Sequence, residues 1–300
     1  MEKQEELVDM DEKGNVINEE NKKDKKTLSS FCKILLFIIL IIIIFCIIYV
    51  FRTFKRMNQI ELIITNNYEE MSLRAADIFT DLIKKNPHAN LGLATGSTPL
   101  GLYKELIKRN KNKEISFKNI TTYNLDEYCG IPQNHEQSYF SFMKENLFNY
   151  IDINLNNTHI PKAEGDIKLN AENYEKMLEE NKLNIQLLGV GRNGHIGFNE
   201  PGSDFHLGVH DVQLDEKTIQ DNARFFGNDM NKVPKNAITM GIKNILDAEI
   251  IVLMANGTKK AEAIESVMSG VVDKNIPVSA LNTHKGKVYV IVDKEAASKL

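Results

Sequence analysis

The residues best suited to chemistry lie in a glycine-rich loop, residues 191–202, which reads GRNGHIGFNEPG. His195 stands five residues before Glu200, so a titratable base has a carboxylate nearby to orient it, which is the minimum for general acid–base catalysis near neutral pH. An isolated pair of this kind is usually only a surface pair. Because neither a second histidine at metal-ligand spacing nor a cysteine cluster accompanies His195, we predict no metal and no other cofactor.

Residues 95–99, which read TGSTP, have the composition of an anion-binding loop. Gly96 lets the backbone approach a ligand closely, while Ser97 and Thr98 offer hydroxyl groups. A helix that begins at Pro99 with Thr98 as its cap would turn free N–H groups toward a phosphate. An ordinary capped turn would look the same, because the lysine and the spacing of a P-loop are absent.

A second loop of this kind, residues 256–260, reads NGTKK and adds Lys259 and Lys260. A lysine at a helix N-terminus works against the helix dipole unless an anion binds there. A solvated lysine pair is the alternative. Two such loops in one sheet nevertheless favour a phosphorylated ligand.

Two adjacent acids, Asp126 and Glu127, follow another strand-like segment. In an extended chain, neighbouring side chains point to opposite sides, so only one of the two can face a pocket. The pattern leaves open which one it is. We expect one of them to be a candidate catalytic carboxylate.

The elements that must position these loops alternate along the chain. Apolar segments predict strands, and the 3.6-residue spacing of apolar side chains over 69–85 predicts a helix that Asn86-Pro87 ends. This alternation predicts an α/β fold with a doubly wound, mostly parallel, Rossmann-like sheet, in which ligands bind beyond the carboxyl ends of the strands. The expected strands cover residues 59–64, 90–94, 120–124, 185–190, 249–255 and 287–292.

Composition limits the classes of protein that fit. The 300-residue chain is 42% hydrophobic and 26% charged, which is typical of globular proteins and excludes collagen-like and wholly disordered chains. A net charge of −4 gives no electrostatic attraction for nucleic acid. The three cysteines provide no disulfide framework, so we expect a reducing compartment.

The N-terminal part differs in composition from the rest. Residues 34–51 contain no charged or amide side chain, and at a rise of ~1.5 Å per residue they would form a helix of roughly 27 Å, close to a bilayer core of ~30 Å. Because basic residues follow this run, we predict an uncleaved transmembrane anchor rather than a signal peptide. The predicted parts are a charged disordered tail (1–30), the anchor with its basic flank (31–56) and a catalytic domain (57–300).

Six motifs, in the order LGLATGSTPLGLY, TTYNLDEYCGI, QSYFSFM, GVGRNGHIGFNEPGS, ARFFG and ANGTKKAEAI, resemble the glucosamine-6-phosphate deaminase family. The resemblance covers residues 59 to about 293 and leaves out the N-terminal 56. It implies hydrolytic deamination of glucosamine 6-phosphate to fructose 6-phosphate and ammonia, through aldose–ketose isomerisation without a metal. The expected setting is the catabolism of amino sugars such as N-acetylglucosamine.

The resemblance also implies a role for each matching residue. His195 would assist opening of the pyranose ring, with Asn193 and Glu200 orienting it. Asp126 would carry a proton between C2 and C1. The residues implied in substrate binding, chiefly at the phosphate, are Gly96, Ser97, Thr98, Arg224 and Lys260.

Two departures from part of the family qualify this expectation. Asn193 stands where many members have aspartate, which would leave ring opening to His195 and Glu200. The segment after Glu200 lacks the basic residues with which regulated members bind an activator, so allosteric activation is not expected. The C-terminal extension of the hexameric members is missing as well, which leaves a homo-oligomer possible.

Two alternative functions fit related folds. A 6-phosphogluconolactonase would have a GHxAS-like string, whereas this chain has GHIGFNEP, and a sugar-phosphate-sensing regulator would need a helix-turn-helix that residues 1–56 lack.

The sequence is compatible with two membrane topologies. The lysines before the apolar run favour a cytosolic N-terminus. Phosphorylated sugars are cytosolic, however, so we expect a single-pass membrane protein with a cytosolic catalytic domain.

Overall fold

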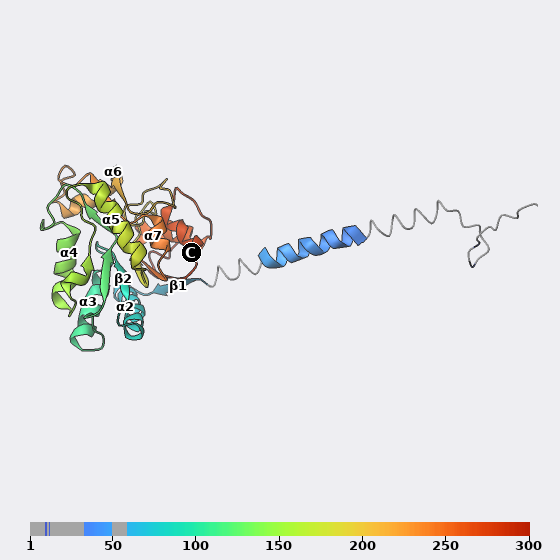
Figure 1. Cartoon of the computed structure of the whole chain (residues 1–300), viewed down its shortest axis with the longest axis horizontal. Coiled ribbons are helices and arrows are strands. Elements are labelled where there is room, and N and C mark those ends of the chain that lie inside the picture. The colour runs from blue at the N-terminus through green and yellow to red at the C-terminus, as the bar shows by residue number, and fades with distance from the viewer. Residues whose placement is uncertain (1–9, 11, 13–32, 50–58) are drawn as a thin grey trace, which may run out of the picture. The chain divides into compact units, whose positions relative to one another are not determined.

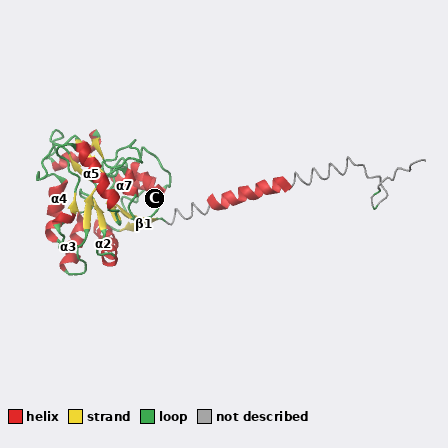
Figure 2. Ribbon diagram, in the orientation of Figure 1, coloured by secondary structure: helices red, strands yellow, loops and turns green. Residues whose placement is uncertain are grey.

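The alternating segments fold as alternating strands and helices in the computed structural model (Figure 1). It describes residues 10, 12, 33–49 and 59–300, and the chain divides into two units, Met1–Met57 and Asn58–Leu300. Figure 2 shows the strands in the middle of the second unit with helices around them.

The second unit contains ten strands and seven α-helices among the described residues. The strands are β1 (Ile60–Thr65), β2 (Asn90–Leu93), β3 (Thr121–Asn124), β4 (Asp126–Tyr128), β5 (Thr158–His159), β6 (Ile185–Leu188), β7 (His210–Gln213), β8 (Asn236–Thr239), β9 (Ile250–Ala255) and β10 (Lys287–Asp293). The α-helices are α2 (Tyr68–Lys85), α3 (Leu100–Lys111), α4 (Tyr139–Asn146), α5 (Ile167–Glu180), α6 (Glu216–Asn222), α7 (Ile242–Leu246) and α8 (Ala261–Met268). Short 3₁₀ turns are η1 (Phe148–Tyr150), η2 (Leu155–Asn157), η3 (Ala223–Phe225), η4 (Thr258–Lys260) and η5 (Pro277–Thr283).

The main sheet has seven parallel strands in the order β1-β10-β9-β6-β2-β3-β5. Its central strands are apolar on both faces, and every residue of β6 is buried, as expected where helices cover both sides of a sheet. All six strands predicted from sequence are present, with ends shifted by one or two residues. The doubly wound α/β prediction is confirmed.

Strand order explains why the four loops meet. The chain runs outward from β2 through β3 to β5 and then returns to pair β6 with the other side of β2, so the winding direction switches between β2 and β6. Ligands bind at such a switch point, beyond the carboxyl ends of the strands. The strands β9, β6, β2 and β3 are neighbours in the sheet, and one of the four predicted loops follows each of them.

A second, antiparallel sheet in the order β4-β8-β7 was not predicted. In its register Asp126 lies opposite Thr239, which in turn lies opposite His210. The first of these strands is the three-residue segment DEY and the last is HDVQ, so neither shows an apolar alternation. We expected the two adjacent acids in a loop, but in this sheet they form part of a buried strand.

Helix ends follow the expected capping chemistry in one case and depart from it in another. The side chain of Asn67 caps α2 by accepting a hydrogen bond from the N–H of Glu70 at 2.8 Å. The prediction of Thr98 as the cap of α3 is wrong: the structure places Pro99 at the N-cap, without a side-chain hydrogen bond. Pro99 lacks an N–H and already has a helical φ of −79°, so the turn closes one residue later than expected.

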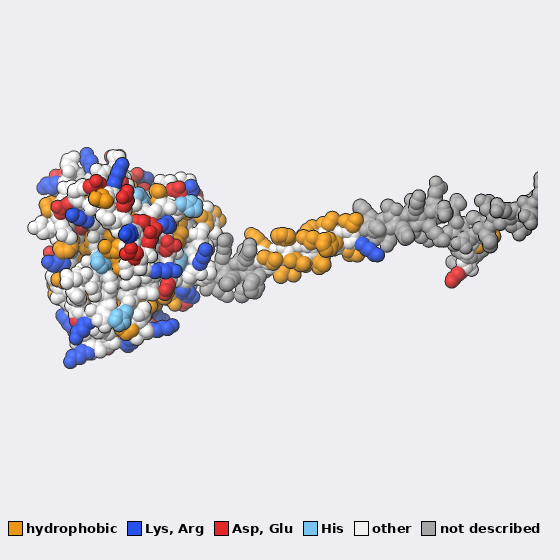
Figure 3. All heavy atoms as spheres, viewed as in Figure 1, with side chains coloured by type: hydrophobic (Ala, Val, Ile, Leu, Met, Phe, Trp, Pro, Cys, Tyr) orange, Lys and Arg blue, Asp and Glu red, His pale blue; other side chains and the backbone are white. Residues whose placement is uncertain are grey.

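The N-terminal unit contains one described helix, over residues 33–49. Its large apolar side chains are exposed (Figure 3). None of the helices in the described ranges combines the length and apolar character needed to cross a membrane. The described residues therefore do not support the predicted transmembrane helix over 34–51, of which residues 50 and 51 lie outside the described range. Residues 1–9, 11, 13–32 and 50–58, which include most of the predicted tail and the whole basic flank, lie outside the described residues.

Candidate active site

A cavity of about 640 Å³ lies where the four loops meet. Its wall contains most of the residues predicted for the site, and Asn193 and Glu200 stand behind His195, to which they are connected. The predicted residues that line it are Gly96, Ser97, Thr98, Asp126, His195, Arg224 and Lys260.

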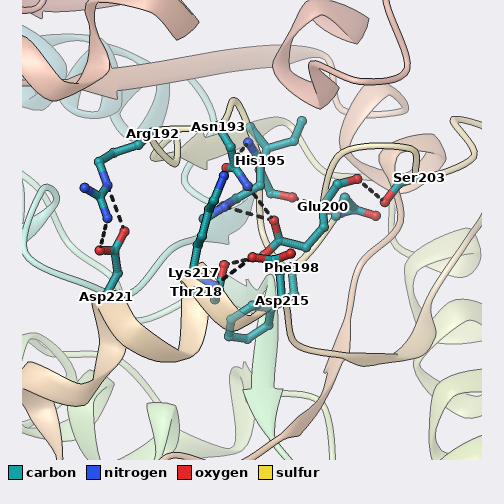
Figure 4. Close-up of polar contacts among 12 residues, drawn as sticks. Arg192, Asn193, His195, Phe198, Glu200, Ser203, Asp215, Lys217, Thr218 and Asp221 are labelled. Atoms are coloured by element: carbon teal, nitrogen blue, oxygen red, sulfur yellow. Dashed lines mark hydrogen bonds and ion pairs between the residues drawn. The ribbon is translucent and has the colours of Figure 1, made fainter. Parts of the chain in front are cut away.

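Glu200 is held by three neighbours and faces the imidazole of His195 (Figure 4). Its Oε2 lies 3.4 Å from Nδ1 of His195, an ion-pair distance without hydrogen-bond alignment. Asn193 donates from Nδ2 to the same oxygen at 2.9 Å and accepts the backbone N–H of His195 on Oδ1 at 3.3 Å. The hydroxyl of Thr218 donates to Oε1. The amide of Asn193 thus orients the carboxylate rather than the imidazole ring.

These contacts determine the charge of Glu200. Burial would raise the pKa of this carboxyl, but His195, Thr218 and Asn193 all favour its charged form and hold the pKa below its usual value. Glu200 is therefore suited to remain a carboxylate that orients a protonated or polarised histidine. It is poorly suited to donate a proton.

Glycine at two positions allows the loop to bring His195 and Asp126 together. The N–H of Gly191 donates to the carbonyl of His195 at 2.8 Å, and a Cβ at Gly191 would lie 2.3 Å from the imidazole. Gly197 has a φ of +57°, and a Cβ there would lie 3.0 Å from the hydroxyl of Thr239 and 3.5 Å from the carboxylate of Asp126. A side chain at Gly191 would push the imidazole away, and at Gly197 the positive φ and the nearby Thr239 hydroxyl oppose any larger residue.

Asp126 is the acid that faces the cavity. Its side chain is 6% exposed, and burial, with a smaller contribution from Glu127, raises the pKa of Asp126 to about 8. A carboxyl with such a pKa can both accept and return a proton near neutral pH.

Glu127 points the other way and stabilises the start of α4. Its Oε1 accepts the N–H groups of Tyr128 and Tyr139 at 2.9 Å each, and Oε2 accepts the N–H of Phe140 at 3.0 Å. Burial raises the pKa of Glu127, and these backbone donors act against that rise. The alternation expected for two adjacent acids is confirmed, with Asp126 toward the cavity and Glu127 toward a helix.

The first anion-binding loop is braced from α2. The hydroxyl of Tyr68 accepts the N–H of Gly101 at 2.8 Å and donates toward the carbonyls of Ser97 and Thr98 at 3.1 and 3.0 Å. The hydroxyl of Thr98 donates to Oδ1 of Asn256 at 3.5 Å, which links this loop to the second one. Sequence analysis missed Tyr68, because a tyrosine at this position is an ordinary first residue of a helix.

The second loop is braced by the end of β10. The N–H of Gly257 donates to both carboxylate oxygens of Asp293, at 3.0 and 3.1 Å, and the same carboxylate accepts the N–H of Ala296 at 2.8 Å. The chain then makes the 3₁₀ turn η4, so that Lys260 stands at the N-cap of α8. The loop is therefore anchored on both sides before it reaches the cavity.

Positive charge gathers at the end of the cavity formed by these loops. Lys260 is partly buried, and this burial is the largest cause of its lowered pKa. The cations Arg192, Arg224 and Lys259 lower this pKa further, whereas Asp221 acts in the opposite direction. A partly buried ammonium beside other cations is an unfavourable arrangement that a bound phosphate would relieve.

Several residues of α6 and its surroundings were missed. Asn222 donates to the hydroxyl of Tyr128 at 2.8 Å, and the rings of Tyr128 and Tyr139 lie 4.8 Å apart in the same wall. Thr218 and Asp221, both on α6, reach the predicted loop 191–202. The helix reads EKTIQDN, which has no apolar period that would place it beside the site.

The described part of the chain contains no group of three or more His, Cys, Asp or Glu side chains arranged to hold a metal ion.

Known proteins resemble this chain in both sequence and fold. A glucosamine-6-phosphate deaminase from Clostridium novyi (strain NT) is 47% identical over 243 residues, which are 80% of this chain and 100% of that one. A deaminase from Thermoanaerobacter sp. (strain X514) is 48% identical over 241 residues, covering 80% of this chain and 94% of the relative. The solved structure of a monomeric glucosamine-6-phosphate deaminase matches with a TM-score of 0.77 and 43% identity, over 81% of this chain and all of the other.

A more distant likeness extends to another enzyme. The structure of 6-phosphogluconolactonase from Trypanosoma brucei matches with a TM-score of 0.67 at 19% identity, over 80% of this chain and 98% of that one, which shows the fold alone.

The fold and the site together define a class: doubly wound α/β proteins in which the segments that contain Asp126, His195 and Lys260 meet at the switch point of the sheet. The family model for glucosamine-6-phosphate isomerases and 6-phosphogluconolactonase matches residues 66–290. The chain belongs to this family.

Proposed function

We propose that the chain catalyses the hydrolytic deamination of glucosamine 6-phosphate to fructose 6-phosphate and ammonia, in amino-sugar catabolism. The observation that carries the proposal is a buried carboxyl with a pKa raised to about 8, Asp126, in one cavity with His195 and with the cationic end at Lys260. The relatives at 44–48% identity are named for this activity.

The first step assigned to the site is opening of the sugar ring. His195, which faces the Glu200 carboxylate that Asn193 orients, moves the proton between the anomeric hydroxyl and the ring oxygen. Glu200 remains charged and stabilises the histidine when it carries the additional proton.

The second step is the isomerisation. The carboxylate of Asp126 removes the proton from C2 of the open-chain amino sugar, and the electron pair of that C–H bond forms a C1=C2 double bond. At the same time the π pair of the C1 carbonyl moves to O1, which takes up the proton released by the C2 ammonium group, so that an enolamine forms. Asp126 then returns the proton to C1, which leaves an imine at C2. Water adds to this imine, and ammonia leaves as fructose 6-phosphate forms.

The cationic end of the cavity holds the phosphate in this proposal. Ser97 and Thr98 supply hydroxyl and backbone groups, Gly96 allows close approach, and Lys260 and Arg224 supply charge. Holding the phosphate there leaves C1 and C2 for Asp126 and His195.

Ammonia release tests the function. The purified full chain, supplied with glucosamine 6-phosphate, is expected to release ammonia and fructose 6-phosphate in equal amounts, and a His195→Gln variant is expected to be strongly impaired. Hydrolysis of 6-phosphogluconolactone without ammonia release would favour the lactonase alternative. Binding of the sugar phosphate with no turnover would favour a sensing domain, and either result would overturn the proposal.

We further propose that residues 34–51 attach the chain to a membrane, with the catalytic domain in the cytosol. The proposal is supported by the absence of charge from this run and by the exposure of the large apolar residues on the described helix, from 38% at Ile41 to 70% at Tyr49. Such an exposed apolar surface is typical of a segment that is covered by lipid or by a partner.

Fractionation of cells tests this attachment. The full chain is expected to sediment with membranes and to be released by detergent but not by high salt, whereas Ile41→Lys with Ile44→Lys is expected to be soluble. A full chain that stays in the supernatant would contradict the attachment. Digestion by added protease in inside-out vesicles but not in intact cells would support the cytosolic side.

The possible homo-oligomer remains a hypothesis, and the solved deaminase at 43% identity is described as monomeric. Light scattering of the detergent-solubilised chain would decide this point.

A further inference from the structure

An ion pair between a loop and helix α6 forms part of the cavity wall. Arg192 follows β6 and Asp221 lies on α6, and both line the cavity. The guanidinium donates from Nε to Oδ2 of Asp221 at 3.1 Å and from Nη2 to Oδ1, so the contact is bidentate (Figure 4). The two side chains are 44% and 42% exposed. A ligand in the cavity can therefore reach both charges.

The charges of this ion pair act on the cationic end of the cavity, where Lys260 and Arg224 lie. Arg192 and Asp221 shift the pKa of the partly buried Lys260 in opposite directions, so both charges act on the residue assigned to phosphate binding. Among the described residues, Arg192 has a carboxylate at ion-pair distance, and no such carboxylate accompanies Lys260 or Arg224. Asp221 is thus the one described acid paired with a cation of this end.

We propose that Asp221 competes with the ligand phosphate for Arg192 and thereby limits the affinity of the site for phosphorylated ligands. The inference rests on the proposed function, which assigns a phosphate to this end of the cavity. A guanidinium binds a phosphate through two parallel hydrogen bonds, as it binds a carboxylate. A phosphate can therefore replace the carboxylate of Asp221 on Arg192 without a new arrangement of donors.

The exchange is favourable for two reasons. A half-exposed ion pair is weakly held, because solvent competes for both partners. A phosphate also carries more charge than a carboxylate and meets Lys260 and Arg224 in addition to Arg192. Asp221, once displaced, still lies near the bound phosphate and repels it, so removing its charge is expected to strengthen phosphate binding.

The opposite role would have the opposite sign. If Asp221 only held Arg192 in the correct position for a phosphate, neutralising Asp221 would release the guanidinium and weaken binding. The direction of one measured change therefore distinguishes a competitor from a support.

The test is calorimetric titration of the full chain with inorganic phosphate at fixed ionic strength. Asp221→Asn is expected to lower the dissociation constant by at least about fivefold, the order expected for one nearby charge. Asp221→Glu, which keeps the carboxylate, is expected to restore the wild-type value. Arg192→Gln is expected to weaken binding more in the Asp221→Asn background than alone, because Arg192 is fully available there.

A matched control removes a carboxylate from another exposed pair. Glu61 lies 2.7 Å from Lys287 near the amino ends of β1 and β10, at the sheet edge opposite the cavity, and Glu61→Gln is expected to leave phosphate affinity unchanged. If Asp221→Asn does not fold, Asp221→Ser offers the same loss of charge with the same expected sign. Unchanged or weaker phosphate binding in these variants would overturn the inference.

The two proposals can fail separately. A wild-type chain that binds no phosphate would overturn the assignment of the cationic end and this inference with it. A chain that releases ammonia and binds phosphate, but does not respond to loss of Asp221, would overturn the inference alone.

Discussion

Two carboxyl groups in one site are driven toward opposite protonation states. Burial raises the pKa of Asp126 to about 8, whereas donors from three side chains hold the pKa of Glu200 below its usual value. Environments that separate the pKa values of two acids assign different roles to them. Asp126 is matched to proton transfer and Glu200 to charge stabilisation, which is the division that the proposed deamination needs.

Replacement of Asp126 by Asn tests the base. The amide keeps the size and polarity of the side chain but cannot accept the C2 proton, so deamination is expected to fall by the ~10²–10⁴ typical of losing a general base, while substrate binding persists. The readout is NMR of C2-deuterated glucosamine 6-phosphate, from which the variant is expected to wash out no label. Washout at the wild-type rate would exclude Asp126 as the base.

The pH profile follows from two displaced pKa values. Asp126 acts as a carboxylate, so kcat/KM is expected to fall as pH drops below about 8. Because the pKa of Lys260 is lowered by burial and by neighbouring cations, activity is also expected to fall at alkaline pH as its ammonium is lost. Measurement of kcat/KM from pH 5 to 11 should give a bell-shaped curve. Lys260→Arg should lose the alkaline limb, because a guanidinium stays charged; an acid limb near the ordinary aspartate pKa would contradict the assignment.

Lys260→Ala is expected to raise KM far more than it lowers kcat. The phosphate is remote from C1 and C2, so its contact contributes mainly uniform binding energy, and the loss of a charge-assisted contact of ~1.5–3 kcal/mol corresponds to roughly a ten- to hundredfold change. Steady-state kinetics at fixed ionic strength give the readout. The neighbouring exposed Lys259→Ala is the matched control, and a larger KM effect at Lys259 would exchange the two roles.

At the scale of elements, short polar segments hold the site. Helix α6 supplies Thr218 to Glu200, Asp221 to Arg192 and Asn222 to Tyr128, and the side chain of Glu127 satisfies the N-terminal N–H groups of α4. Free N–H groups at a buried helix start are costly, so Glu127 is structural although it stands beside the catalytic candidate.

Glu127→Ala is expected to destabilise the fold by ~1–3 kcal/mol, because backbone donors at the start of α4 lose their acceptor. Urea unfolding measures the change. Glu145→Ala, which removes an exposed acid from the same helix, is expected to have little effect. Equal stability of the two variants would show that Glu127 does not cap α4.

Sequence analysis predicted those parts of the structure that a single segment of the chain determines by itself. The six strands of the parallel sheet are apolar runs whose periods are visible, and the loops after them contain the residues that reach the cavity. The strand β4, helix α6 and the brace from Tyr68 could not be predicted, because their roles depend on partners 18 or more residues away. The role of Asn193 was equally hidden, since its sequence neighbours do not show that the amide faces Glu200.

At the scale of the whole molecule, apolar exposure is unevenly distributed. Within 59–300 the exposed large apolar residues are scattered, and the visible face mixes both signs of charge (Figure 3). Over 33–49 nearly all side chains are large, apolar and exposed. The two units therefore have different requirements for solubility, and the chemistry belongs to the second.

A chain truncated to begin at Met57 is expected to be soluble and folded, with kcat/KM equal to that of the full chain. The first strand begins at Ile60, the units divide after Met57, and no candidate site residue precedes Gly96. Thermal unfolding and the ammonia assay, compared with the full chain in detergent, give the readouts. A chain beginning at Asn66 is the control: it loses β1, whose six residues pair with β10, and is expected to melt at lower temperature. Aggregation of the Met57 chain beside an active full chain would show that the catalytic domain needs residues before Met57.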